Sequence, residues 1–171
     1  MLKRIAGLVG GAAFGLTLGI VAAAPVSAQA VLGPHAAACR GNQGAVLVTV
    51  DGFRQRTGNL RVQLYRADSS FLERGRWLQR IDLPVTRAGA MRVCVPVEQP
   101  GSYAIAVRHD MDGNGSSGWN DGGGFSRNPG ISLTNLRPRA SAVAINVGRA
   151  TLPINVVLNY RFGLSIRPVR G

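Results

Sequence analysis

The pattern that decides the fold stands at residues 60–65, which read Leu60-Arg61-Val62-Gln63-Leu64-Tyr65. Apolar and polar side chains alternate here with a period of two, so one face of the segment is apolar and the other is largely polar. A period of two is typical of a β-strand that buries one face in a core. Residues 60–65 are therefore predicted to form a strand of a half-buried sheet.

The same alternation recurs on both sides of this segment. Turn-forming residues separate several of the runs, as at Thr57-Gly58-Asn59. Seven or eight short strands without helical repeats predict an all-β fold, an antiparallel β-sandwich. The alternation is clear at residues 45–51, 91–97, 103–107, 143–147 and 154–160, and weaker at 76–83 and 164–166.

The first 28 residues have the composition of a secretory signal peptide. Lys3 and Arg4 form a positively charged start, and residues 5–24 are apolar and uncharged. Small residues then lead to Ala28, after which we expect signal peptidase to cut, with Ala30 as the second choice. An uncleaved membrane anchor is the alternative, because a bilayer span needs about 20 apolar residues. We expect a periplasmic or secreted protein with no transmembrane span after cleavage.

The rest of the chain is long enough for one domain with a hydrophobic core. We assign residues 29–43 to an N-terminal arm and residues 44–171 to a single β-sandwich domain. The chain has two cysteines, Cys39 and Cys94, and an even number in an oxidising compartment predicts a disulfide. In the chain-entropy model this bond would stabilise the fold by about 4 kcal/mol. A redox pair or two free thiols are the alternatives, although no Cys-x-x-Cys motif is present.

The net charge of the chain is strongly positive, at +12. Lys3 is the only lysine, and no acidic residue follows Asp121. A charge of this sign attracts polyanions such as lipid phosphates or nucleic acid. The arginines are scattered singly along the predicted strands, which a general compositional bias toward Arg also produces. A polyanion-binding envelope protein that uses dispersed Arg is therefore an alternative function.

Residues 108–142 interrupt the strand pattern with many Gly, Asn, Ser and Pro. A connection of this length without secondary structure is unusual inside a compact domain. We therefore predict one long Gly-rich loop and expect any specific chemistry to lie in it.

Within this loop, alternate positions carry side-chain oxygens, at Asp110, Asp112 and Asn114. Oxygens at this spacing converge on one hard cation in calcium-binding loops. Ser116 would offer its carbonyl, and Asp121 stands at the closing position of such a loop. These five residues predict a weak Ca²⁺ site. The alternative is that they only form turns, because Asp, Asn and Gly all favour turns.

Trp119 and Phe125 are aromatic residues in the polar loop. Such rings stack on sugars or bases, so both are candidate ligand-stacking residues; the alternative is that they fold the loop onto the sandwich. His109 stands beside Asp110 and is the candidate acid–base group of the loop. No nucleophile elbow, zinc-protease motif or zinc-ligand spacing accompanies it, so we expect no catalytic site.

Three parts of the chain carry a family resemblance: residues 47–53 with 58–65, residues 100–110, and residues 112–115 followed by 124–128. Together they resemble the bacterial exported family catalogued as domain of unknown function 2141, over most of residues 44–160. The resemblance implies an immunoglobulin-like or transthyretin-like sandwich and export, and it implies no activity. Loops of that family commonly place an acidic residue soon after the second glycine, where this chain has Ser116, Ser117 and Gly118; its acidic residue, Asp121, comes later.

We expect a non-enzymatic exported module whose long loop contacts a partner or a glycan, with calcium as the one candidate cofactor. The polyanion-binding envelope protein is the second hypothesis. A hydrolase that uses His109 with Asp110 or Asp112 is the third.

The signal-peptide prediction is testable by mass spectrometry of the exported protein. The mature chain should begin at Gln29, because the cut falls after Ala28. An exported protein that still begins at Met1 would contradict the prediction.

Overall fold

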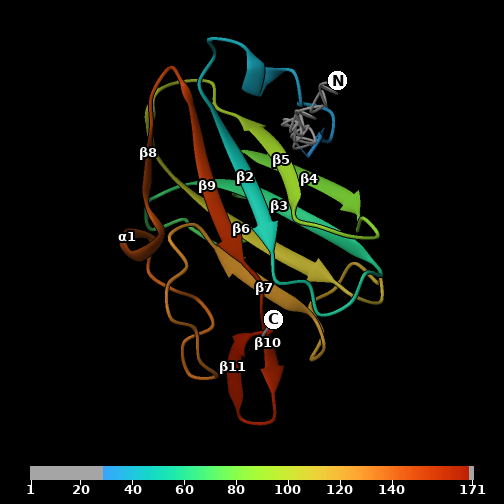
Figure 1. Cartoon of the computed structure of the whole chain (residues 1–171). Coiled ribbons are helices and arrows are strands. Elements are labelled where there is room, and N and C mark those ends of the chain that lie inside the picture. Colours follow the sequence, from blue (N-terminus) through green and yellow to red (C-terminus); the bar gives the residue numbers. More distant parts are fainter. Residues whose placement is uncertain (1–28, 170–171) are drawn as a thin grey trace, which may run out of the picture.

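The computed structural model describes residues 29–169, and the predicted signal peptide at residues 1–28 lies outside the described residues. Two β-sheets pack against each other (Figure 1), so the predicted all-β sandwich is confirmed. Within residues 29–169, no helix is both long enough and apolar enough to cross a bilayer.

The smaller sheet contains β1 (Val31–Leu32), β5 (Met91–Pro96), β2 (Ala45–Asp51) and β9 (Thr151–Val157), in this order. β2 pairs in antiparallel with β5 but in parallel with β9, and β1 pairs in parallel with β5. Two pairs thus differ from the antiparallel arrangement that we predicted. The sequence pattern does not specify this, because alternation sets which face is buried and leaves the direction of the partner open.

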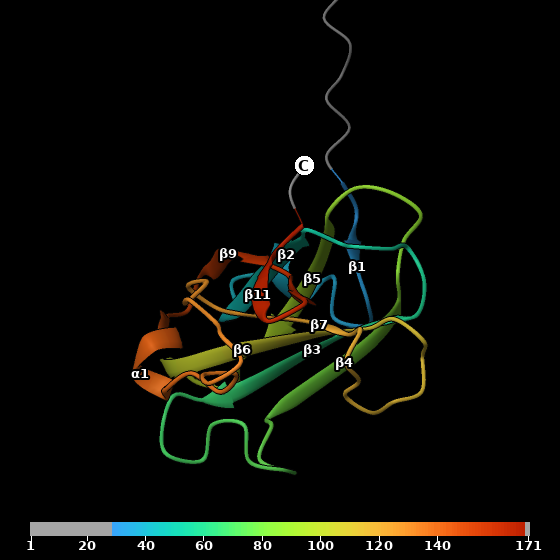
Figure 2. The same cartoon turned by 90° about the horizontal axis from the view of Figure 1, so that it is seen from below.

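The larger sheet contains β11 (Ser165–Pro168), β10 (Asn159–Phe162), β7 (Gly122–Phe125), β6 (Gly101–Asp110), β3 (Asn59–Arg66) and β4 (Gln79–Pro84), in this order. A further strand, β8 (Ile145–Val147), pairs with the start of β6. All pairs in this sheet are antiparallel. Figure 2 shows β6, β3 and β4 side by side.

The core lies between the inner faces of the two sheets, and its residues alternate along the strands as the sequence indicates. Full burial of one such side chain contributes about 1.5–3 kcal/mol. A second apolar cluster covers the outer face of the larger sheet and includes Tyr65, Phe71 and Phe125. The main core includes Val46, Val48, Val50, Leu60, Val62, Leu64, Val93, Val95, Tyr103, Ile105 and Val107.

The chain passes from the smaller sheet to the larger one at Leu158, between β9 and β10. We predicted a single strand over residues 154–160, and the alternation does continue through Val156, Leu158 and Tyr160, which are all buried. The pairing changes, however, because β9 pairs with β2 whereas β10 pairs with β7 and β11. The predicted strand is therefore two strands that belong to different sheets.

The predicted loop at residues 108–142 contains more regular structure than its sequence indicates. β6 continues to Asp110, β7 pairs with it, and a short helix, α1 (Ala140–Val143), precedes β8. The long Gly-rich loop is therefore divided into two connections, at residues 111–121 and 126–139.

Three consecutive glycines form most of β7, which explains why this strand shows no apolar alternation. A Cβ atom on Gly124 would lie 2.7 Å from Cγ1 of Val156 and 2.8 Å from the carbonyl oxygen of Val157. A Cβ atom on Gly122 would clash with the ring of Tyr160. The glycines therefore let residues 156–160, where the chain crosses from one sheet to the other, pack directly against β7.

Cys39 and Cys94 form the predicted disulfide, with their Cα atoms 5.8 Å apart. Cys39 lies in the 3-10 helix η1 (Ala38–Arg40), and Cys94 lies in β5. β1 also pairs with β5. The segment predicted as an N-terminal arm, residues 29–43, is thus attached to β5 at two places.

The glycine contacts of β7 give a matched pair of substitutions. Gly124→Ala should destabilise the fold by about 1–3 kcal/mol, because the new methyl group overpacks a fixed backbone contact. Gly123→Ala should change stability little, because a Cβ atom there would meet only the carbonyl oxygen of Val107, at 3.7 Å. Urea unfolding of both variants measures the difference. If the two substitutions changed the free energy of unfolding equally, the direct packing of Val156 and Val157 against Gly124 would be contradicted.

Candidate functional site

The candidate site lies at the end of β6, where the pairing of His109 with Gly122 closes residues 110–121 into a loop. The ring of Tyr160 packs against Gly122 on the inner face of the sheet. Asp110 follows His109, and Asp121 precedes Gly122. The strand pairing therefore brings these two acidic residues to the base of the same loop.

His109 is buried in the core and both of its ring nitrogens have hydrogen-bond partners. Its Nε2 lies 2.8 Å from the carbonyl oxygen of Thr57, which can only accept, so Nε2 carries the proton and donates. The hydroxyl of Tyr160 then donates to Nδ1 over 2.6 Å and accepts from the backbone N–H of Arg54 over 3.2 Å. His109 therefore acts as a neutral, structural link.

Burial shifts the pKa values of both His109 and Tyr160. It lowers the pKa of His109, and the hydrogen bond to Thr57 opposes this only in part. It raises the pKa of Tyr160 to about 12. Because the imidazole has no free nitrogen and no exposed surface, its position gives no support to the hydrolase hypothesis.

Asp110 lies on the opposite, outer face of β6, yet it is only 2% exposed. Its Oδ2 accepts from the backbone N–H of Gly115 over 2.8 Å and lies 3.4 Å from Nη2 of Arg108. Its Oδ1 is buried and has no hydrogen-bond partner within residues 29–169. A buried carboxylate oxygen without a partner is costly, since most buried polar atoms in proteins are satisfied.

Asp112 and Asp121 complete a group of three carboxylates. One oxygen from each of Asp110, Asp112 and Asp121 lies within 4.8 Å of the others. Ligands at the usual Ca²⁺–oxygen distance of about 2.3–2.6 Å lie up to about 5 Å apart across the ion, so this spacing fits a single cation. The predicted metal residues Asp110, Asp112 and Asp121 are thus together in the structure.

Asn114 and Ser116, the other two predicted ligands, form turns. Asp112 Oδ1 accepts from the N–H of Asn114 over 3.1 Å, and Asn114 Oδ1 accepts from the N–H of Ser116 over 2.7 Å. Gly113 and Gly115 have positive φ values of 70° and 80°, which favour glycine. Asn114 and Ser116 therefore form turns, as the alternative interpretation predicts. The three aspartates form the cluster of carboxylates.

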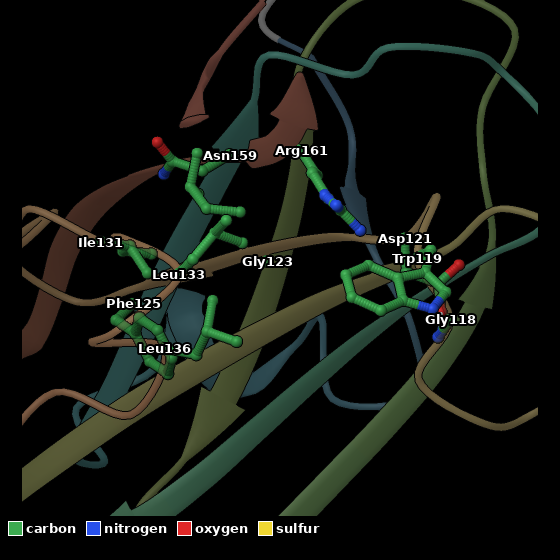
Figure 3. A pocket seen from close by; sticks show the side chains of 11 residues that line it. Gly118, Trp119, Asp121, Gly123, Phe125, Ile131, Leu133, Leu136, Asn159 and Arg161 are labelled. Atoms are coloured by element: carbon green, nitrogen blue, oxygen red, sulfur yellow. Dashed lines mark hydrogen bonds between the residues drawn. The ribbon is translucent and has the colours of Figure 1, made fainter. Parts of the chain in front are cut away.

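Asp121 also connects the cluster to a neighbouring pocket. Its Oδ1 accepts from the N–H of Met111 and its Oδ2 from that of Gly118, so it holds both ends of the loop. The pocket has a volume of about 180 Å³ (Figure 3). Its lining residues are Gly118, Trp119, Asp121, Gly123, Phe125, Ile131, Leu133, Leu136, Asn159, Arg161 and Ile166.

The two predicted stacking residues, Trp119 and Phe125, both line this pocket but differ in their exposure. Trp119 is 73% exposed, and the guanidinium carbon of Arg161 lies 3.8 Å from its ring centroid. Phe125 is only 9% exposed and packs edge-on against Phe71, with ring centroids 6.0 Å apart. Phe125 is therefore a wall of the pocket that packs onto the sandwich, as its alternative interpretation predicts.

Sequence reasoning did not single out Tyr160 or Arg161. A signal for Tyr160 was available, because a tyrosine on the apolar face of a strand needs a partner for its hydroxyl, and His109 also falls on an apolar face. No signal pointed to Arg161, because its place over Trp119 depends on pairing between β10 and β7.

The pKa of His109 predicts a pH dependence of stability. Because burial lowers this pKa, below about pH 6.5 the unfolded chain takes up a proton more readily than the folded one. The free energy of unfolding should therefore be highest above pH 6.5 and fall as the pH is lowered. His109→Gln should reduce this dependence between about pH 7 and 5, whereas His35→Gln should keep it. An unchanged dependence in His109→Gln would contradict the assignment.

The chain was compared with known protein families, and a family model matches it. A family model described as an uncharacterized protein conserved in bacteria (DUF2141) matches residues 48–155, which is more than half of the chain. The matched segment runs from β2 into β9 and includes the whole acidic loop. No curated protein and no solved structure matches. The resemblance seen in the sequence is therefore confirmed: the chain belongs to the DUF2141 family.

Proposed function

We propose that the protein is an exported β-sandwich module whose acidic loop, residues 110–121, binds one Ca²⁺ ion, and that it acts by binding and not by catalysis. The single observation that carries the proposal is that Oδ1 of Asp110 is buried and has no hydrogen-bond partner among the described residues, on a carboxylate that is one of a group of three. A cation among these carboxylates satisfies that oxygen.

The charge of the loop supports a divalent ion. Asp110, Asp112 and Asp121 carry three negative charges, and carboxylates this close repel one another. Arg108 supplies one positive charge, through contacts with Asp110 Oδ2, the hydroxyl of Ser117 and the carbonyl oxygen of Gly115. The remaining charge of −2 is the charge that one divalent cation neutralises.

The donor atoms and the loop favour calcium over other divalent ions. Carboxylate and carbonyl oxygens are the ligands of hard cations. Mg²⁺ requires a near-octahedral arrangement, whereas Ca²⁺ accepts irregular ones such as this Gly-rich loop provides. Asp121 in place of a longer glutamate makes the site weak, with a dissociation constant of about 10⁻⁴–10⁻³ M, as in extracellular modules.

Export is supported by two features at different points of the chain. The N-terminal 28 residues have the composition of a signal peptide, and Cys39 pairs with Cys94 in a disulfide. Disulfides form and persist in oxidising compartments such as the periplasm. Calcium is also available at higher concentration outside the cytoplasm, which suits a weak site.

Thermal melting with calcium or with a chelator tests the proposal. At ten times the dissociation constant, calcium stabilises the fold by about 1.4 kcal/mol. The Tm should then rise by about 3–6 °C for a domain of this size.

A matched pair of variants locates the effect. Asp112→Asn removes one charge of the cluster but keeps the oxygen that accepts from Asn114, so it should abolish most of the calcium-dependent rise in Tm. Asp68→Asn is the control, because Asp68 accepts from Ser70 in an equivalent turn outside the cluster. No rise in the wild-type protein would end the calcium proposal. An equal calcium-dependent rise in the Tm of Asp112→Asn would mean that the ion binds at another site.

A further inference from the structure

Large exposed apolar side chains gather at one end of the sandwich. Within residues 29–169 four such side chains are exposed: Leu78, Trp119, Leu136 and Leu164. Trp119 and Leu136 line the same pocket, and Leu164 lies in the turn between Arg161 and Ile166, which also line it. Three of the four therefore share one surface.

Leu164 is the most exposed of them, at 85%, because of the hairpin that carries it. β10 and β11 pair from Asn159–Pro168 to Phe162–Ser165, which leaves Gly163 and Leu164 as a two-residue turn. Figure 1 shows this hairpin extending from the body of the sandwich. At this exposure, Leu164 contributes little to the packing of the residues that the structure describes.

Three arginines lie along the two faces of this hairpin, with Arg161 on the face toward Trp119 and with Arg54 and Arg167 over Phe162 on the opposite face. The guanidinium of Arg161 lies over the ring of Trp119, and those of Arg54 and Arg167 lie 4.9 and 4.0 Å from the ring centroid of Phe162. None of the three forms an ion pair with a carboxylate in the described part of the chain. We name the end of the sandwich that carries this hairpin, with Trp119, Leu136, Leu164, Arg54, Arg161 and Arg167, the hairpin end.

We infer that the hairpin end docks on the surface of a bilayer that contains anionic phospholipids. Leu164, Leu136 and Trp119 enter the interfacial region, where apolar side chains and the amphipathic indole are favoured. The arginines meet the lipid phosphates, at about 1 kcal/mol for each basic residue near an anionic surface. The net charge, which is +12 for the whole chain and +10 without Lys3 and Arg4 of the predicted signal peptide, adds a long-range attraction to the anionic surface.

Two other occupants fit the hairpin end less well. A soluble glycan would stack on Trp119, but Arg161 already covers one face of this ring at 3.8 Å. A soluble polyanion would use the arginines and leave the exposure of Leu164 and Leu136 without a role. A lipid surface uses both kinds of side chain.

Flotation of the exported protein with lipid vesicles tests this inference. All samples contain a chelator, so that the result does not depend on calcium at the acidic loop. The protein should float with vesicles of phosphatidylglycerol and phosphatidylethanolamine and remain unbound with vesicles of phosphatidylcholine alone. High salt should weaken the binding, because it screens the attraction between arginines and phosphates.

Matched variants separate the apolar and the charged contributions. Leu164→Asn should weaken binding about tenfold, from the loss of one inserted side chain, and Leu78→Asn should not change it. Arg167→Gln should weaken binding about fivefold. Arg149→Gln is its control, because Arg149 lies in the exposed turn between β8 and β9. Figure 1 shows this turn at the end of the sandwich opposite the β10–β11 hairpin.

Three results would overturn the inference. Loss of vesicle binding in Arg167→Gln but not in Leu164→Asn would mean that the protein adsorbs to the anionic headgroups by charge alone and inserts no apolar side chain. Equal binding to both kinds of vesicle would remove the role of anionic lipid. Absence of vesicle binding, with or without binding of a soluble oligosaccharide, would exclude a membrane-docking surface. Thermal melting of each variant checks that it is folded.

Discussion

The structure of this end of the sandwich depends on one buried contact, between Tyr160 and the pair formed by His109 and Gly122. The hydroxyl of Tyr160 donates to His109 over 2.6 Å, and its ring lies where a side chain on Gly122 would stand. His109 and Gly122 are themselves paired across β6 and β7. Because Tyr160 follows the crossing from the smaller to the larger sheet, this contact fixes β6, β7 and β10 relative to one another.

The period of the strands then determines what lies on the outer face. Asp110 and Asp121 flank the His109–Gly122 pair, so their carboxylates meet at the base of the loop and Asp112 joins them. Arg161 follows Tyr160 and lies over Trp119. The proposed cation site and the hairpin end are therefore two consequences of the same contact. One is built from acidic residues on the loop, and the other from basic and apolar residues on the hairpin and on the connections beside it.

Sequence patterns predicted the parts of the structure that local periodicity encodes. The strand at residues 45–51 has the predicted bounds, and the spacing of the aspartates indicated which carboxylates come together. β7 was not predicted, because its glycines have no periodicity and its position depends on Tyr160 and Val156, far along the chain. The burial of Phe125 likewise depends on the distant Phe71. The loop folds back so that Gly115 donates to Oδ2 of Asp110, while Oδ1 is left without a partner among the described residues. The spacing of residues in the sequence does not predict this arrangement.

The most direct test of the account is terbium luminescence, because Tb³⁺ takes the place of Ca²⁺ among oxygen ligands and is excited by a nearby tryptophan. Trp119 stands two residues from Asp121, whereas Trp77 lies in the connection between β3 and β4. With excitation at a wavelength that tryptophan absorbs and tyrosine does not, we expect sensitised emission that Ca²⁺ displaces, that disappears in Trp119→Phe and that persists in Trp77→Phe. Absence of emission, or emission that survives in Trp119→Phe, would contradict a cation held by Asp110, Asp112 and Asp121.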